Sequence, residues 1–481
     1  MIRTLVYIRM QRLPMIHHPL QSASTSTYWM PTFRCLMTSM RSWPRIDTVF
    51  VSLVLSIVAM TSHVIAADFK ESDRSHALTM LRDVQNEIQG SYFDPSFKGI
   101  DLGANAEIAK TRISKATSVG ETLAAIAQFV LELDDSHTFF VPPWQTATVE
   151  YGWDMGIVGD KCYVLAVKPG SDAARQGVTR GDMVKTVNGL TPTRESLWRL
   201  EYLFHTLRPQ PGLHVELVST KGTARELDLA SNVHQRKKVI ALTGDDSSWD
   251  RARLIDDRDK QVREQQPTLV EVGKKVLVAR LPTFAAEDSV IKEVLRRSYG
   301  HEVLILDLRG NPGGRVTALQ TLLGGLSSSD VNLGETKERD HAAPLIAKGT
   351  HADAFTGRVF VLIDAESASA SELVARAMQL TDRGTVIGDR SAGAVMTSRY
   401  HPLMVSHGEN VISYGVMITA ADPIMPDGGR LEKKGVEPDF KVLPTAEDLS
   451  AGRDPALAQA LKFSGQSMDA QAAGALLRRS E

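Results

Sequence analysis

Apolar residues recur at helical spacing in the first well-patterned part of the chain, from Asp68 to about Pro143. One stripe, at positions i, i+4, i+7 and i+11, predicts a helix with a single buried face; its members are Ala77, Leu81, Val84 and Ile88. A second stripe of this kind consists of Leu123, Ile126, Phe129, Val130 and Leu133. The polar turn 134–138 ends the pattern, so this N-terminal part is predicted to be helical.

From about Tyr151 to Ala230 short apolar runs alternate with glycine turns. Runs at 162–167, 183–187 and 214–218 predict strands, and Asn188-Gly189 is typical of a tight hairpin. A short helix is predicted at 172–174 and a longer amphipathic helix at 195–207. The pattern therefore predicts a compact β-rich module with two helices.

From Lys275 to about Val442 apolar strands alternate with helical stretches. The strands are short and mostly continuous in apolar residues, at 276–281, 303–306, 359–363 and 385–387. Such strands favour an α/β sheet that is covered on both faces. The polar segment 231–270 before them is predicted to be a linker, and the tail after Ala446 is predicted to be helical.

Composition excludes several classes of protein. The 481 residues are 43% hydrophobic and carry a net charge of −2, which argues against a general nucleic-acid binder and against a disordered acidic chain. The chain has two cysteines, Cys35 and Cys162. It therefore has neither a disulfide scaffold nor a cysteine-rich metal site.

The first 66 residues have the pattern of an export signal. Residues 1–46 contain no acidic residue and six arginines, and the apolar run Val49–Met60 follows. Small residues then lead to a cleavage site after Ala66, in a signal that begins at Met40. The protein is therefore expected to be periplasmic or extracellular. The alternative is an uncleaved membrane anchor, for which the apolar run is short; transient membrane association through this segment is expected.

Two glycine- and serine-rich segments follow predicted strands and carry candidate chemistry. The first, 306–314, reads LDLRGNPGG, and its glycines let backbone N–H groups face negative charge. It matches neither phosphate-loop pattern, so an oxyanion hole and a plain tight turn are the alternatives that remain. Asp307 and Arg309 are expected to shape this loop rather than to react.

The second segment, 365–372, reads AESASASE and opens a predicted helix. A serine at a helix start is usually a cap. Three serines that alternate with alanine exceed what a cap requires, and a helix N-terminus stabilises a developing oxyanion. The segment is therefore a candidate for a nucleophile on a sharp turn.

These segments, in this order, resemble the C-terminal-processing (tail-specific) serine peptidases, which have a crotonase-like core and a PDZ domain. GDRSAGA at 388–394 and GVEPDF at 435–440 add to the resemblance. It implies an α/β fold, with a crotonase-like α/β catalytic core, an N-terminal helical region and an inserted PDZ-like β-rich domain. It also implies that Ser369 is the nucleophile, with the N–H groups of Ala370 and Gly313 as oxyanion donors and Gly314 as the alternative second donor.

The chain departs from this family at the general base. The processing peptidases use a lysine where this chain has Ala394, and 388–394 contains no lysine. The related tricorn-core branch instead uses a serine–histidine pair and a glutamate before a Gly-Val-x-Pro-Asp stretch. The resemblance to that branch implies a tetrad of Ser136, His137, Ser369 and Glu432.

In this tetrad His137 would accept the Ser369 proton, Ser136 would hold the imidazole tautomer, and Glu432 would fix a polar link. The neighbouring carboxylates Asp134 and Asp135 lack partners at metal-ligand spacing, so a solvated turn is expected there. No metal and no cofactor are expected.

The β-rich module resembles a PDZ domain over residues 169–189, PGSDAARQGVTRGDMVKTVNG. Such domains add an extended peptide, usually a C-terminus, as a strand. The expected carboxylate-binding loop consists of Tyr151, Gly152, Trp153, Asp154, Met155, Gly156 and Ile157. The alternative is a β-domain that acts only as a spacer.

The predicted organisation is an upstream extension with signal peptide (1–66), a helical region (67–147), a PDZ-like domain (148–232), a linker (233–271), a tail-specific protease core (272–446) and a helical tail (447–481). We expect an exported serine endopeptidase that acts through an acyl-enzyme. Its partner would be a protein or peptide substrate, with the substrate C-terminus on the PDZ-like domain, and not nucleic acid. The alternatives are a non-catalytic binder of peptides or apolar ligands on the same fold, and an esterase or other acyl-transfer enzyme.

Overall fold

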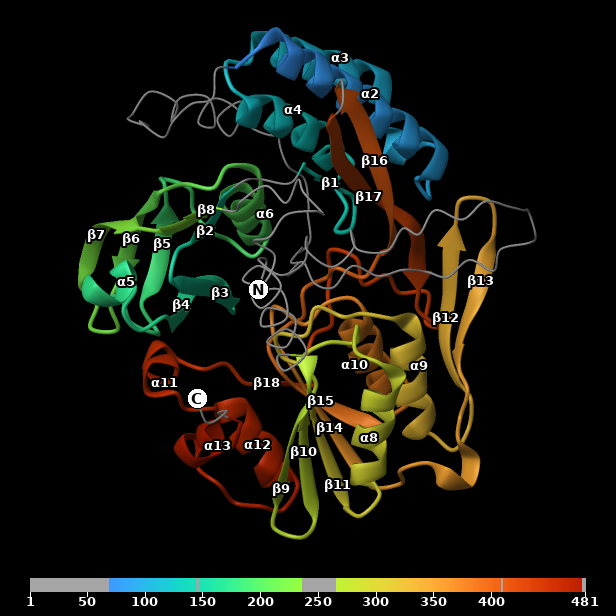
Figure 1. The fold of residues 1–481 in the computed structure, drawn as a ribbon. Helices are drawn as coiled ribbons and strands as arrows, with labels where there is room; N and C mark the ends of the chain where they lie inside the picture. The colour runs from blue at the N-terminus through green and yellow to red at the C-terminus, as the bar shows by residue number, and fades with distance from the viewer. Residues whose placement is uncertain (1–68, 144–146, 236–264, 408–409, 478–481) are drawn as a thin grey trace, which may run out of the picture.

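The structure is a computed structural model that describes residues 69–143, 147–235, 265–407 and 410–477. The predicted signal segment and most of the predicted linker lie outside these residues. Figure 1 shows helices at the N-terminus, a β-rich module beside them, and a sheet core with helices on its two sides. In the part of the chain that the structure describes, no helix is both long and apolar enough to cross a membrane.

Three helices form the N-terminal part, as the apolar stripes predict: α2 (Glu71–Ser91), α3 (Leu102–Lys115) and α4 (Val119–Leu131), with the short η3 (Phe97–Gly99) between the first two. The side chains of Asp101 and Ser118 cap α3 and α4 by accepting backbone N–H groups of the first turn. Buried residues of α2 include all four members of the first stripe.

An extended hairpin from the far end of the chain packs against these helices (Figure 1). It consists of β16 (Thr397–His407) and β17 (Asn410–Ile424). β17 also pairs antiparallel with β1 (Phe139–Val141) and with β12 (Val331–Glu338), which in turn pairs with β13 (Ala342–Ala347). The polar turn 134–138 is therefore tied through β1 to the C-terminal part of the chain.

The β-rich module contains a five-stranded antiparallel sheet in the order β3-β4-β5-β6-β7. Its strands are β3 (Trp153–Val158), β4 (Lys161–Val167), β5 (Met183–Val187), β6 (Gly212–Val218) and β7 (Ala224–Ala230), and β2 (Ala147–Glu150) pairs with β8 (Asn232–Gln235) beside it. The three predicted strands are confirmed as β4, β5 and β6. The sequence pattern did not predict β3 and β7. The helices are α5 (Asp172–Arg175) and α6 (Leu197–Tyr202); the helix predicted at 195–207 ends early because its second half is the π-helical turn η4 (Leu203–Leu207).

The core sheet has the order β18-β15-β14-β11-β10-β9, and it is parallel except at β9. Its strands are β9 (Thr268–Val272), β10 (Val276–Arg280), β11 (Val303–Asp307), β14 (Arg358–Ile363), β15 (Gly384–Gly388) and β18 (Phe440–Lys441). Helices α8 (Asp288–Ser298), α9 (Val316–Gly325) and α10 (Ala370–Leu380) cover one face; α12 (Pro455–Phe463) and α13 (Ala470–Leu476) cover the other. The remaining elements are η5 (His351–Asp353) and α11 (Ala446–Ala451).

Side chains of one strand alternate between the two faces of this sheet. Leu304 and Leu306 of β11 pack with α8, α9 and α10, whereas Val303 and Ile305 pack with α12 and α13. The predicted sheet with two covered faces is therefore confirmed. Because β11, β14 and β15 are parallel neighbours, the segments that follow them, with the glycine-rich, serine-rich and GDRSAGA sequences, meet at one edge.

A buried ion pair attaches the β-rich module to this edge. Arg194 Nη2 lies 2.7 Å from Asp389 Oδ2 and 2.6 Å from the Gly159 carbonyl oxygen, and Nη1 donates to the Arg390 carbonyl oxygen. The Gly159 N–H also donates to Asp389 Oδ2 at 2.8 Å. Both charged side chains are almost inaccessible to solvent, at 4% and 6% exposed.

Replacing Arg194 with Met is predicted to reduce the free energy of unfolding by about 3–5 kcal/mol, because Asp389 would remain as a buried charge without its partner. Urea unfolding measures the change. The control is Arg175→Met in the same module, because Arg175 is 64% exposed and its contacts with Asp172 and the Gly170 carbonyl oxygen lie at the surface; its cost should be within about 0.5 kcal/mol. Equal effects of the two substitutions would contradict this role of the buried pair.

Candidate active site

Ser369 occupies the N-cap of α10 with a strained backbone, at φ 55° and ψ −117°. Positive φ is rare for a residue with a side chain, and such strain is concentrated at functional sites. The Ser369 N–H donates to the Ala394 carbonyl oxygen at 2.8 Å and to Glu372 Oε2 at 3.0 Å. Ser369 thus sits on a sharp turn, at a helix start, 6% exposed.

Glu372 holds this turn, and sequence reasoning missed its role. Its buried carboxylate accepts from the Ser369 N–H, the Ser391 hydroxyl at 2.6 Å, and the N–H groups of Gly393 and Ala394 at 2.7 and 2.8 Å. Burial raises the pKa of Glu372 to about 7. The only available signal was its position three residues after Ser369, which is capping-box spacing.

The glycine-rich segment packs directly against the serine. Gly313 has φ +91°, and a Cβ there would lie 2.6 Å from the Ser369 Cβ and 2.9 Å from the Ala370 nitrogen. Asn311 is buried and holds the segment, since its Nδ2 donates to the Leu281 carbonyl oxygen and its own carbonyl oxygen accepts from Ala368 N–H and the Ser371 hydroxyl. Arg309 binds both Asp307 and Asp454, so these charged side chains shape the loop.

The predicted oxyanion donors are not equivalent. The Gly313 N–H donates to Asn311 Oδ1 at 2.8 Å and is therefore engaged in this structure. Among the described residues, the N–H groups of Ala370 and Gly314 have no protein acceptor. Of the three predicted donors, Ala370 and Gly314, the latter being the alternative that the sequence offered, are thus the two whose N–H groups are not engaged by a described residue.

Ser136, His137 and Glu432 form one hydrogen-bonded chain. Ser136 Oγ lies 2.6 Å from His137 Nδ1 and 2.8 Å from Glu432 Oε2, and the Ser136 N–H donates to Glu432 Oε1 at 2.9 Å. His137 is 8% exposed and Ser136 3% exposed. Residues that are far apart in the sequence therefore meet as predicted.

The Ala394–Val395 segment links this chain to Ser369. The Ala394 carbonyl oxygen accepts from the Ser369 N–H, and the Val395 N–H donates to Glu432 Oε2 at 3.0 Å. No hydrogen bond joins the His137 ring to Ser369 among the described residues. Catalytic hydrogen bonds are often long or poorly aligned without substrate and tighten when substrate binds.

Burial sets the protonation states of the two titratable groups. It lowers the pKa of His137 to about 4, and the nearby charge of Asp135 acts in the opposite direction. Loss of solvent raises the pKa of Glu432 to about 7, and the Asp135 charge adds to this rise. The neutral imidazole, which is the form that accepts a proton, is therefore favoured at neutral pH.

The prediction of a solvated turn at Asp134 and Asp135 is wrong for Asp135. Its side chain is buried, at 2% exposed, and it accepts hydrogen bonds from residues of three segments. Asp134 is partly exposed and pairs with Lys433 and Arg199. The difference arises because buried hydroxyl donors surround the Asp135 carboxylate, whereas the Asp134 carboxylate reaches the surface, where two cationic side chains pair with it.

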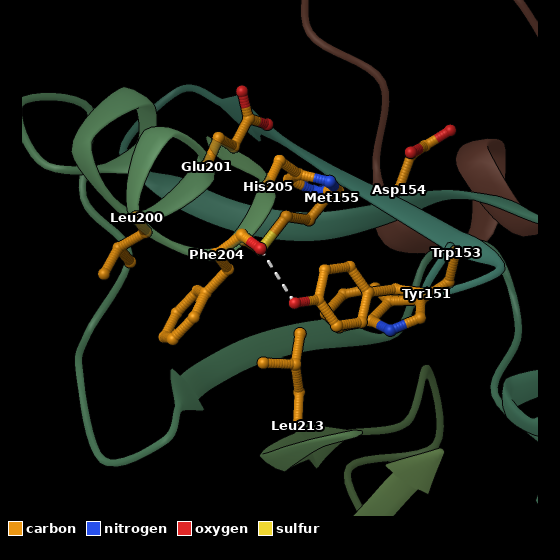
Figure 2. A pocket seen from close by; sticks show the side chains of 9 residues that line it. All are labelled: Tyr151, Trp153, Asp154, Met155, Leu200, Glu201, Phe204, His205 and Leu213. Carbon is orange, nitrogen blue, oxygen red and sulfur yellow. Dashed lines mark hydrogen bonds between the residues drawn. The ribbon is translucent and has the colours of Figure 1, made fainter. Parts of the chain in front are cut away.

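A separate groove lies between β3 and α6 (Figure 2). It has a cavity volume of about 30 Å³ and is lined by Tyr151, Trp153, Asp154, Met155, Leu200, Glu201, Phe204, His205 and Leu213. The Tyr151 hydroxyl donates to the Phe204 carbonyl oxygen at 2.9 Å, which fixes the ring at one end. Four of the seven residues predicted for peptide binding line this groove; Gly152, Gly156 and Ile157 do not.

The three residues that do not line the groove, Gly152, Gly156 and Ile157, pack beside it. Gly152 has φ +75° and packs against Ser171, and Gly156 packs against Leu165 of β4. Ile157 is buried at 4% exposed. β3 is an edge strand, so one side of it is unpaired within the described sheet.

Comparisons with known proteins agree with this architecture. Residues 275–442 match the model of Peptidase family S41. The chain is 26% identical over 322 residues to the Tail-specific protease of Haemophilus influenzae, covering 64% of this chain and 43% of that protein. It is 25% identical to the chloroplastic Carboxyl-terminal-processing peptidase 2 of Arabidopsis thaliana, covering 86% of this chain and 79% of that protein.

The structure is also similar to mature CPAF complexed with lactacystin, with a TM-score of 0.58 and 16% identity over 79% of this chain and 96% of that one. This likeness shows the fold alone. Residues 275–442 therefore carry a domain of the predicted peptidase family, and the chain is similar in sequence to proteins named as tail-specific and C-terminal-processing peptidases. It spans less than half the length of the Haemophilus relative.

Replacing Gly313 with Ala is predicted to lower kcat/KM by at least about 10²-fold, because the new Cβ would displace Ser369 and the oxyanion donors. The control is Gly310→Ala in the same segment. Gly310 also has positive φ, at +67°, but the nearest atom to its Cβ would be 3.7 Å away. Steady-state kinetics on a peptide substrate, with circular dichroism to check folding, measures both. Similar losses for the two variants would contradict a close-packing role for Gly313.

Proposed function

We propose that the protein is a serine endopeptidase in which Ser369 forms an acyl-enzyme and His137 is the general base. The observation that carries this proposal is the hydrogen-bonded chain from Glu432 through Ser136 to His137, linked to the strained Ser369 by Ala394 and Val395. A serine at its ordinary pKa needs an adjacent base to become a nucleophile. The chain of hydrogen bonds supplies an oriented one.

The direction of each hydrogen bond follows from what the reaction requires. His137 must leave Nε2 unprotonated to accept the Ser369 proton, so Nδ1–H donates to Ser136 Oγ. The Ser136 hydroxyl then donates to the Glu432 carboxylate. When His137 becomes an imidazolium, the ionised Glu432 stabilises it through this relay. The same imidazolium returns the proton to the leaving amine.

A lysine base has less support. Position 394 is alanine, and its backbone binds Ser369 and Glu372. Lys433 lies beside Glu432, but its ammonium pairs with Asp134.

The oxyanion would be bound at the start of α10. Ala370 N–H is open there, and Gly314 N–H provides a second donor from the glycine-rich segment. The N-terminus of α10 adds its dipole. Gly313 N–H would join them only after it leaves Asn311 Oδ1.

We further propose that the β-rich module is a PDZ-like domain that captures the C-terminus of a protein or peptide substrate, and that it is inserted before a crotonase-like core with the predicted boundaries. The unpaired side of β3 and the adjoining groove support strand addition at this place. Export to the periplasm or cell exterior, after cleavage near Ala66, belongs to the same proposal and rests on the sequence pattern. The curated relatives include chloroplastic proteins.

Ser369→Ala and His137→Ala are each predicted to lower kcat by at least about 10²-fold while the protein stays folded. The double variant should be little worse than either single variant, because members of one catalytic unit are not additive. Peptide turnover measures these losses, and a fluorophosphonate probe reports the nucleophile directly.

The matched control is Ser371→Ala, because Ser371 lies on the same helix start but binds the Asn311 carbonyl oxygen. The probe should label this variant and should not label Ser369→Ala. If Ser369→Ala is labelled or keeps normal turnover, the nucleophile lies elsewhere. If wild-type protein neither turns over peptides nor takes the probe, the protein is a binder instead, and ester turnover without peptide turnover would indicate an esterase.

The rate is predicted to fall as the pH drops through about 7, because Glu432 then takes up a proton and no longer stabilises the imidazolium. His137 loses its ability to accept a proton only near pH 4. Glu432→Gln should therefore lower the rate at high pH and remove the fall near pH 7, which is the upper acid limb of the rate profile. The fall near pH 4, the lower limb, should remain. The pH dependence of kcat/KM checks this, and a wild-type rate that is constant from pH 8 to pH 5 would contradict it.

A further inference from the structure

We propose that Asp135 is a positioning residue for His137: its ionised carboxylate fixes the Ser136–His137 turn and places a permanent negative charge beside the imidazole. This inference rests on the proposed role of His137 as the base. The sequence and the comparisons assign no role to Asp135, and its neighbour Asp134 differs from it in burial and in partners.

Asp135 accepts hydrogen bonds from three separate segments of the chain, and these bonds hold the Ser136–His137 turn in place. Oδ2 accepts from the Tyr92 hydroxyl, at the end of α2, at 2.7 Å. Oδ1 accepts from the Thr419 hydroxyl of β17 at 2.7 Å and from the His137 N–H at 3.0 Å. Thr138 binds both Asp135 and Thr419. The carboxylate is therefore the point at which the helical region, the β16–β17 hairpin and the His137 backbone are joined.

The hydrogen-bond donors around Asp135 match an ionised carboxylate group. A protonated carboxyl group would present a hydrogen of its own, whereas an ionised one only accepts. Asp135 faces two hydroxyl groups and a backbone N–H at 3.0 Å or less, with Lys98 Nζ at 3.8 Å. Burial and the Asp135 charge raise the pKa of Tyr92, so that hydroxyl remains a donor. An ionised carboxylate can accept all of these hydrogen bonds at once.

The other charged side chains near the Ser136–His137 turn are bound by partners of their own. Asp134 is bound by Lys433 and Arg199, and Lys98 also donates to the carbonyl oxygens of Leu133 and Asp134. Glu432 faces the turn from the opposite side through Ser136. The Asp135 charge raises the pKa of both His137 and Glu432. Removing it should therefore move the acid limb of the rate profile to lower pH.

Asp135→Asn tests the inference because it preserves shape and removes charge. We expect a folded protein with kcat lowered roughly 10²-fold, KM within about twofold, and the upper acid limb moved down by about one pH unit. Asp134→Asn is the matched control and should move neither quantity. A role in packing alone would leave the limb where it is in the wild-type protein.

Two further variants keep the test decisive if Asp135→Asn fails to fold. Thr419→Val and Tyr92→Phe each remove one hydrogen bond to the carboxylate and retain its charge, and each should lower kcat about three- to tenfold without moving the limb; Thr419→Ser should restore the rate. Wild-type kcat and an unmoved limb in Asp135→Asn, or full activity in both hydroxyl variants, would overturn the inference. Failure of the proposed function would be seen separately, as normal turnover in His137→Ala.

Discussion

The Glu432 carboxylate accepts three hydrogen bonds that join segments nearly three hundred residues apart in the sequence: two from Ser136 and one from Val395. One oxygen is shared by the Ser136 hydroxyl and the Val395 N–H, so the same group orients the base and fixes the segment that holds Ser369. This carboxylate is therefore a direct polar link between the His137 turn and the segment that follows β15. The arrangement of the whole site follows from that constraint.

Other buried carboxylates extend this constraint in three directions. Glu372 ties the Ser369 turn to residues 391–394, and Asp135 ties the His137 turn to the N-terminal helices and β17. Asp389 ties the β-rich module to the same edge through Arg194. Each carboxylate is satisfied by several donors, which offsets the cost of removing a charge from water. The three parts of the chain therefore meet at one place. The Arg194–Asp389 ion pair connects the β-rich module directly to the segment that binds Ser369.

Much of the fold could be predicted from the sequence because its signals are local or periodic. The stripe at Ala77 and Leu81 gave the first helix, and the apolar runs gave the covered parallel sheet. Ser369, His137 and Glu432 could be named because their neighbours in sequence resemble a known family. Asp135, Glu372 and Arg194 could not, since their roles depend on partners nearly two hundred residues away or more, or on burial that no local pattern indicates. The engagement of Gly313 by Asn311 is a matter of side-chain rotation, which a motif does not specify.

The most direct test of the account is a crystal structure of the protein after reaction with a peptidyl phosphonate. We predict a covalent bond from phosphorus to Ser369 Oγ, with the phosphonyl oxygen bound by Ala370 N–H and Gly314 N–H. His137 Nε2 should lie within hydrogen-bond distance of Ser369 Oγ, and Ser136 Oγ should still bridge His137 Nδ1 and Glu432. Phosphorus on another residue, or a lysine in the place of His137 beside Ser369 Oγ, would contradict the account.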